Sequence, residues 1–148
     1  MIADSGERRS FETGAVRDIQ EGKGRPSLMP LEVVYMLLNR DNVIYYLGRF
    51  KENGCTANLY GALKEFSKMV YGGSCETMSL EVSKHFEEGA KKYGENNWQK
   101  GIPADCYLDS AIRHYLKYRR GDQDEPHDRA FVWNVMCCIW EVDCHDKD

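Results

Sequence analysis

Hydrophobic residues recur every three or four positions along most of the chain from residue 31 onward. This spacing places apolar side chains on one face of a helix. Glycine and Asn-Gly pairs interrupt the pattern at intervals, and both favour the left-handed turn that ends a helix. The pattern predicts six helices: residues 31–39, residues 42–51, a helix capped by Thr56 that ends before Gly72, a helix from a cap at Ser79 to Tyr93, residues 104–120, and a helix capped by Asp124 that runs through Trp140.

The N-terminal part of the chain has a different pattern. Prolines exclude a helix between residues 11 and 30, and Val16, Ile19 and the Gly-Lys-Gly run at 22–24 predict a short β-hairpin. Its basic residues stand on a glycine-rich frame that suits an anionic ligand and equally suits an ordinary polar turn; they are Arg17, Lys23 and Arg25. Residues 1–10 are polar and are expected to be flexible. We therefore predict a mainly α fold, a helical bundle with a small N-terminal β-hairpin, as a single domain over residues 11–148.

Composition narrows the classes of partner. The net charge is −4, so the chain lacks the excess of basic residues with which proteins grip duplex nucleic acid. No apolar run reaches membrane-spanning length, and the N-terminus lacks the apolar core of a signal peptide. The six cysteines show no CxxC spacing, which is typical of reduced thiols in an intracellular protein. Zinc binding by Cys144 and His145 would need a second ligand pair, and none has suitable spacing.

The stretch from His85 to Trp98 is the strongest candidate for a ligand site. A helix stops at Gly94, and aromatic and amide side chains surround the stop. Rings stack on a nucleobase and amides can read its edge, while nearby cations hold phosphate. The structural alternative is a helix cap with an aromatic ring packed beneath it. The side chains in question are Tyr93, Asn96, Asn97, Trp98, Lys91, Lys92 and, farther along, Arg113.

Several short blocks together resemble the phage family named dATP/dGTP diphosphohydrolase. They lie within residues 11–32 and 79–141 and include Thr13-Gly14-Ala15-Val16-Arg17-Asp18, Gly89-Ala90-Lys91-Lys92-Tyr93-Gly94, Asn97-Trp98, Gly101-Ile102-Pro103, Leu108-Asp109-Ser110-Ala111-Ile112-Arg113-His114 and Trp133-Asn134. Between them, residues 33–78 form a helical insertion relative to the shorter family.

The blocks together with this insertion resemble the Thoeris anti-defence protein 1 family of phages. That resemblance implies a homo-oligomer, such as a hexamer, in the cytoplasm of the infected bacterial host. It also implies a sponge, a protein that sequesters cyclic ADP-ribose-type immune signals without cleaving them. A second site can hold cyclic oligonucleotides, and no cofactor is implied. Phe86 would stack on the base, Asn96 would hydrogen-bond, and Arg113 would hold phosphate. The implied ligand-binding residues are Phe86, Asn96, Arg113, Tyr93, Trp98, Asn97, His114 and Lys92, with Arg25, Ser27 and Met29 at the second site.

An enzyme remains the alternative interpretation. A metal-dependent dATP/dGTP pyrophosphohydrolase would release dNMP and pyrophosphate, with Mg²⁺ or Mn²⁺ held by several carboxylates. Here a lysine occupies the last acidic position of the nearest Glu-Glu-x-x-Glu signature, at residues 87–91. The candidate metal ligands would be Glu81, Glu88, Asp109 and Asp128, although Asp109 and Arg113 are also spaced to form a surface salt bridge. A carboxylate-poor site favours binding over catalysis, and a third interpretation makes the aromatic and arginine side chains a protein interface.

Overall fold

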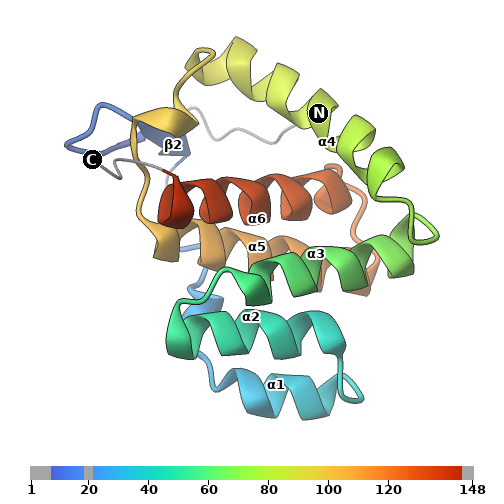
Figure 1. The fold of residues 1–148 in the computed structure, drawn as a ribbon. Helices are drawn as coiled ribbons and strands as arrows, with labels where there is room; N and C mark the ends of the chain where they lie inside the picture. Colours follow the sequence, from blue (N-terminus) through green and yellow to red (C-terminus); the bar gives the residue numbers. More distant parts are fainter. Residues whose placement is uncertain (1–7, 19–21, 145–148) are drawn as a thin grey trace.

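Two antiparallel strands and six α-helices, with two short 3-10 turns, make up the described part of the chain in the computed structural model, residues 8–18 and 22–144 (Figure 1). The mainly helical class with an N-terminal hairpin in one domain is confirmed. The elements are β1 (Arg8–Ser10), β2 (Val16–Asp18), η1 (Pro26–Leu28), α1 (Leu31–Leu37), α2 (Asn42–Asn53), α3 (Ala57–Val70), α4 (Cys75–Tyr93), η2 (Trp98–Lys100), α5 (Ala104–Arg120) and α6 (His127–Asp143).

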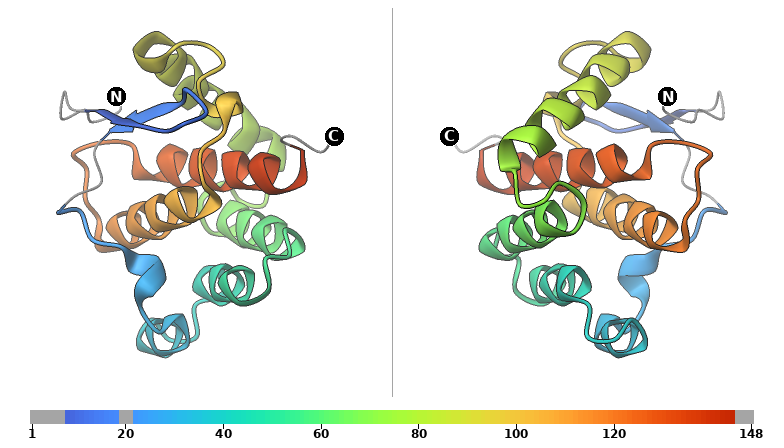
Figure 2. Two further views of the ribbon diagram at one scale, coloured as in Figure 1. Left: turned by 90° about the vertical axis from the view of Figure 1, so that its left-hand side faces the viewer. Right: turned by 90° about the vertical axis from the view of Figure 1, so that its right-hand side faces the viewer.

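Helices α5 and α6 lie side by side at the centre of the molecule (Figures 1 and 2). On one side α4 crosses α6, and on the other α3, α2 and α1 follow one another in a row. The Phe66 ring of α3 lies 4.5 Å from the Phe131 ring of α6 and 6.0 Å from the Tyr115 ring of α5. The segment 33–78 therefore contributes to the same core as the rest of the chain.

The start of α4 differs from the prediction. Ser74, not Ser79, is the cap residue: its Oγ accepts a hydrogen bond from the Thr77 amide at 3.0 Å, as a capping side chain does. Ser79 lies one turn inside the helix and donates its hydroxyl to the Cys75 carbonyl at 2.8 Å. Both serines precede apolar residues at helical spacing, so the hydrophobic pattern alone does not distinguish Ser74 from Ser79 as the cap.

Two other predicted cap residues do not cap their helices. Thr56 precedes α3 but makes no side-chain cap, and its hydroxyl donates to the Asp143 carboxylate at the end of α6. Asp124 does not cap α6, which begins at His127 after Pro126; its carboxylate bonds to the His127 ring at 2.7 Å. Thr56 thus has a partner 87 positions away, whereas Asp124 bonds to the side chain of the first residue of the helix.

The hairpin begins earlier than the sequence indicated. Strand β1 uses Arg8–Ser10, which were assigned to the flexible N-terminus, and pairs them with Val16–Asp18, Ser10 opposite Val16. The turn closes with a hydrogen bond from the Phe11 amide to the Ala15 carbonyl at 3.0 Å. It passes through Gly14 at φ +90°, a conformation that favours glycine. Ile19, predicted to belong to the hairpin, lies outside the described residues.

The described residues contain no membrane-spanning helix and no disulfide bond. None of the helices in residues 8–18 and 22–144 is both long and apolar enough to cross a membrane. All six cysteines are free thiols; Cys106, Cys137 and Cys138 are buried in α5 and α6, and the other three are exposed.

Candidate functional site

Arg17 reaches from strand β2 into the space above α5 and α6. Its Nη2 donates to the Ser110 hydroxyl and to the Asn134 side-chain oxygen, both at 3.1 Å. The guanidinium carbon lies 5.2 Å from the centre of the Tyr107 ring and 5.8 Å from that of Trp133. Its Nη1 is buried without a hydrogen-bond partner among residues 8–18 and 22–144. A cation with an unused buried donor is suited to an anionic ligand.

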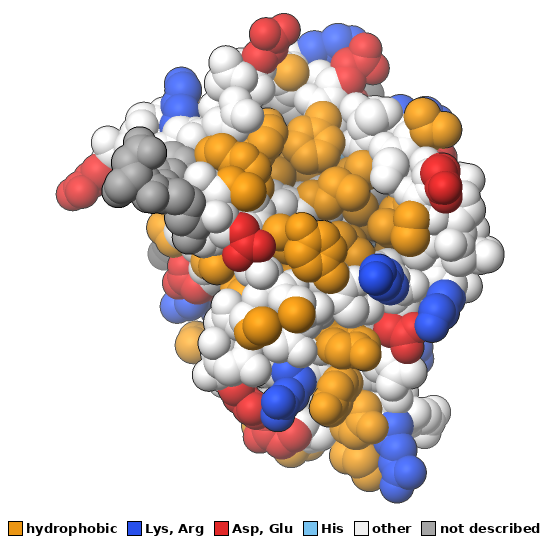
Figure 3. All heavy atoms as spheres, viewed as in Figure 1, with side chains coloured by type: hydrophobic (Ala, Val, Ile, Leu, Met, Phe, Trp, Pro, Cys, Tyr) orange, Lys and Arg blue, Asp and Glu red, His pale blue; other side chains and the backbone are white. Residues whose placement is uncertain are grey.

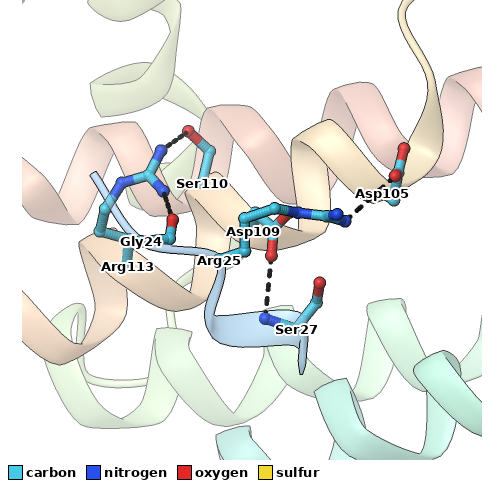
Figure 4. A network of polar contacts seen from close by, with 7 residues as sticks. All are labelled: Gly24, Arg25, Ser27, Asp105, Asp109, Ser110 and Arg113. Carbon is cyan, nitrogen blue, oxygen red and sulfur yellow. Dashed lines mark hydrogen bonds and ion pairs between the residues drawn. The ribbon is translucent and has the colours of Figure 1, made fainter. Parts of the chain in front are cut away.

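Arg113 of α5 shares the Ser110 hydroxyl with Arg17. Its Nη2 donates to that hydroxyl at 3.2 Å, and its Nη1 donates to the Gly24 carbonyl at 2.9 Å (Figure 4). Burial lowers the pKa of Arg113, and the charges of Arg17 and Arg9 lower it further. Burial likewise lowers the pKa of Arg17, with Arg9 again adding to the effect. An anion placed between these guanidinium groups would therefore relieve both desolvation and mutual repulsion.

A second polar network holds residues 24–27 against α5. Asp109 is buried, and its carboxylate accepts hydrogen bonds from Arg25 Nε at 2.8 Å and from the Ser27 amide at 2.9 Å (Figure 4). Arg25 also bonds to Asp105 at 3.3 Å. The expected surface salt bridge between Asp109 and Arg113 is wrong, because Asp109 points to Arg25 while Arg113 bonds to Gly24. The pKa of Arg25 is raised by its hydrogen bond to Asp109.

Aromatic rings form a cluster next to the arginines. The Phe86 ring of α4 lies 5.7 Å from the Trp98 ring and 5.9 Å from the Trp133 ring, and Trp98 lies 5.1 Å from Trp140. Hydrophobic side chains accordingly gather along the surface between α4 and α6 in Figure 3. Trp133 belongs to both groups, since it contacts Phe86 on one side and Arg17 on the other. The rings and the cations are thus joined by a continuous series of contacts.

Other predicted site residues have structural partners. Asn97 is buried, and its side chain exchanges two hydrogen bonds of 2.7 Å with the backbone of Val16, so it fastens β2. Asn96 is exposed on the loop before Trp98. The Tyr93 ring lies under the Arg8 guanidinium at 4.9 Å, and Lys92 is half-buried near the end of α4.

The remaining residues lie away from the ring cluster. His114 faces His127 rather than the arginines, with their Nδ1 atoms 2.9 Å apart. At the expected second site, Arg25 and Ser27 bond to Asp109, and the Met29 carbonyl accepts a hydrogen bond from Lys51 at 3.1 Å.

The four candidate metal-binding carboxylates do not come together. Glu81 pairs with Lys84 at 2.6 Å, Glu88 with Arg129 at 3.1 Å, and Asp128 accepts from the Tyr71 hydroxyl at 3.4 Å. Asp109 is occupied by Arg25. Within residues 8–18 and 22–144, the groups of three side chains close enough to share a metal ion contain none of these four carboxylates.

Sequence reasoning named Arg17 as a residue suited to an anionic ligand, but it did not connect Arg17 with Ser110, Trp133 and Asn134. A signal existed for Asn134, a polar residue among apolar neighbours in α6 that must find hydrogen-bond partners. Its Nδ2 donates to the Ala130 carbonyl at 2.8 Å, which leaves its oxygen to accept from Arg17. That partner lies 117 positions away, beyond the reach of local spacing.

Comparison with known proteins gives one match. A family model described as dATP/dGTP diphosphohydrolase, N-terminal, matches residues 63–148. The matched range begins inside α3, so it takes in the last part of the segment 33–78, and it does not extend to residues 11–32. It includes Phe86, Trp98, Ser110, Arg113 and Trp133, but not Arg17. No curated protein and no solved structure matches the chain.

Proposed function

Because this match covers more than half of the chain, the protein belongs to the dATP/dGTP diphosphohydrolase N-terminal family. Within that family, we propose that this protein binds and sequesters a cyclic ADP-ribose-type nucleotide without cleaving it. The observation that carries the proposal is the continuous contact from Phe86 through Trp133 to Arg17 and Arg113. Aromatic rings, which can stack on an adenine, lie next to guanidinium groups, which can bind a pyrophosphate, and this arrangement supports the proposal.

The strength of such contacts suits a tight binder. Each stacked base contributes about 1–3 kcal/mol, and each hydrogen bond to a charged group contributes about 1.5–3 kcal/mol. A nanomolar dissociation constant corresponds to about 12 kcal/mol. A few contacts of both kinds on a frame fixed by Ser110 and Asn134 are therefore sufficient, because little ordering is left to be done on binding.

The arrangement of the carboxylates supports sequestration over hydrolysis. Hydrolysis of a triphosphate in an all-α enzyme requires several carboxylates that converge on a metal ion. Glu81, Glu88 and Asp109 each pair with a separate lysine or arginine instead. The rings of α4 and α6, together with the guanidinium groups of Arg17 and Arg113, are instead groups suited to binding a nucleotide.

The test is binding followed by recovery of the ligand. Calorimetry with cyclic ADP-ribose should show tight binding, and heating the complex should release the ligand intact, as judged by mass spectrometry. Phe86→Ala and Arg113→Ala should each weaken binding by about tenfold or more, since each removes on the order of 1.5 kcal/mol. Arg49→Ala, an exposed arginine on α2, is the control and should leave affinity unchanged. Recovery of a cleaved product, or equal affinity in Arg113→Ala, would contradict the proposal.

The description of the matched family favours a second candidate, a metal-dependent dATP/dGTP diphosphohydrolase. Purified protein incubated with dGTP or dATP and Mn²⁺ would then release pyrophosphate, and Glu88→Gln would abolish that release. No turnover across purine and pyrimidine triphosphates would remove this candidate.

We also propose the finer assignment, to the Thoeris anti-defence protein 1 family, and with it a homo-oligomer, a hexamer, in the cytoplasm of the infected host. Its second site, with Arg25, Ser27 and Met29, would take a cyclic oligonucleotide. Light scattering coupled to size exclusion measures the assembly, and a mass near that of one chain would contradict it. Because Arg25 and Arg113 flank the same segment, Arg25→Ala should be assayed with both ligand classes.

A further inference from the structure

Two histidines, His114 within α5 and His127 at the start of α6, face each other. The Nδ1 atoms of His114 and His127 are 2.9 Å apart, and the rings are tilted by 39°. His127 is buried, while His114 is half-buried. At that separation one nitrogen must donate a proton to the lone pair of the other. Two imidazole nitrogens that converge on one point can also share a metal ion in place of the proton.

Asp124 fixes which nitrogen of His127 is available. Its Oδ1 lies 2.7 Å from His127 Nε2, so the proton of the neutral ring belongs on Nε2 and the lone pair lies on Nδ1, facing His114. Histidine ligands to metals commonly donate their second nitrogen to a carboxylate in this way. His127 is therefore oriented and set in the tautomer that a metal requires.

Glu125, on the loop between α5 and α6, lies close enough to the two histidines to be a third ligand. One carboxylate oxygen of Glu125 and one nitrogen from each histidine lie within 4.8 Å of one another. In a tetrahedral zinc site, ligand atoms about 2 Å from the ion lie roughly 3.3 Å apart. The half-buried Glu125 side chain can close the difference by rotating.

A competing group of Asp122, Asp124 and His127 meets the same distance limit. Asp122, however, is already bound by both nitrogens of Arg120 that face it, and that hydrogen-bonded pair lowers its pKa. Recruiting Asp122 would require breaking this ion pair. Asp124 would have to leave His127 Nε2 or share it with the ion.

The loop also leaves room for a further ligand. A cleft of 420 Å³ opens beside Glu125 and His127, and it is lined by Tyr118, residues 122–126, His127 and Asp128. Two nitrogens and one carboxylate with an open fourth position are the arrangement of a zinc site that retains a water molecule. We propose that His114, His127 and Glu125 bind a single Zn²⁺ ion, with Asp124 orienting His127. The site is independent of the proposed nucleotide site, since it shares no ligand with the ring and arginine cluster.

The experiment uses the full chain stripped with a chelator and then titrated with Co²⁺, followed by displacement with Zn²⁺. One equivalent of Co²⁺ should bind with intense visible absorption of a four- or five-coordinate ion, and Zn²⁺ should abolish that absorption. Glu125→Gln and His114→Ala should weaken binding by about 100-fold or more. Asp124→Asn should weaken it by about 10–100-fold, as loss of an orienting partner does.

Matched variants make the ligand set falsifiable. Asp122→Asn and Cys144→Ser should bind Co²⁺ as the parent chain does, and circular dichroism should show that every variant is folded. Loss of binding in Asp122→Asn with retention in Glu125→Gln would overturn the assigned ligands. Thiolate-to-cobalt bands in the near ultraviolet, or no visible absorption at one equivalent, would overturn the site.

Discussion

His85 is a buried histidine whose environment keeps it neutral. Its ring lies 5.9 Å from that of Trp133, and its Nδ1 has no hydrogen-bond partner among the described residues. Burial lowers its pKa to about 4, and the nearby charge of Arg129 acts in the same direction, as does Lys92, while Glu88 opposes them. Protonation of His85 is therefore linked to unfolding.

This linkage predicts acid sensitivity. The folded-state pKa is depressed from 6.5 to about 4, so between these values the unfolded chain binds more protons. The contribution of neutral His85 to the free energy of unfolding is full above about pH 6.5, and it is lost as the pH falls toward 4. Urea unfolding at about pH 7 and about pH 4.5 should show that His85 accounts for up to about 2 kcal/mol of the lost stability.

The variant His85→Gln isolates the effect of His85 on stability, because the carboxylates titrate in the same pH range in the parent and in the variant. The difference in unfolding free energy between parent and variant should change by that amount between the two pH values. An identical difference at both would show that His85 titrates normally in the folded chain.

At the same scale, sequence reasoning could name candidate residues but not their partners. The role of Arg113 in holding phosphate stays a prediction, and the structure shows that Arg113 shares the Ser110 hydroxyl with a second cation, Arg17. Its expected partner Asp109 instead binds Arg25, which lies 84 positions away. A carboxylate in a helix can choose between a neighbour one turn away and a distant cation, and only the packing of η1 on α5 decides between them.

At the scale of elements, Asn97 fixes the hairpin to the bundle. Its side-chain oxygen accepts from the Val16 amide and its nitrogen donates to the Val16 carbonyl, both at 2.7 Å, so it mimics a neighbouring strand. Thr13 adds a hydrogen bond from its hydroxyl to the Gly101 carbonyl. The element that carries Arg17 is thus held by the loop on either side of η2.

Removing this attachment should loosen the hairpin. We expect Asn97→Ala to cost about 1–3 kcal/mol, because it leaves the donor and acceptor of Val16 unpaired. Hydrogen exchange of the β2 amides should accelerate more than that of the α5 amides. Nucleotide affinity should also fall, since Arg17 is no longer positioned. Gln99→Ala, an exposed neighbour, should change neither measurement; equal acceleration in β2 and α5 would mean that Asn97 acts on the whole fold.

The helices were more predictable than the hairpin for a physical reason. The α5 boundaries, Ala104 and Arg120, followed directly from a helical stripe closed by Gly121 at φ +91°. Strand β1 has no apolar alternation, and its polar residues pair with β2, which Asn97 holds in place from a distant part of the sequence. Local spacing encodes a helix, whereas a three-residue strand depends on contacts made elsewhere.

At the scale of the molecule, the helical row α1–α3 belongs to the main core. The family match starts inside α3, which indicates that part of the segment 33–78 is shared with that family. Phe66 of α3 lies next to Tyr115, Phe131 and Tyr118, residues of α5 and α6. If these contacts join the row to the rest, both should unfold together.

Phe66→Ala should therefore lower the unfolding free energy by about 3–5 kcal/mol. Far-ultraviolet circular dichroism reports all helices, while tryptophan fluorescence reports the distant cluster of Trp98, Trp133 and Trp140. Both probes should shift to the same lower midpoint, since a cavity at Phe66 weakens one cooperative unit.

Phe66→Leu, which leaves a smaller cavity, should give a smaller common shift if the alanine variant does not fold. The exposed Tyr60 on the same helix is the matched control, and Tyr60→Ala should stay within about 0.5 kcal/mol of the parent. A fluorescence midpoint unchanged by Phe66→Leu while the helical signal shifts would show that α1–α3 unfolds by itself, as a detachable insertion would.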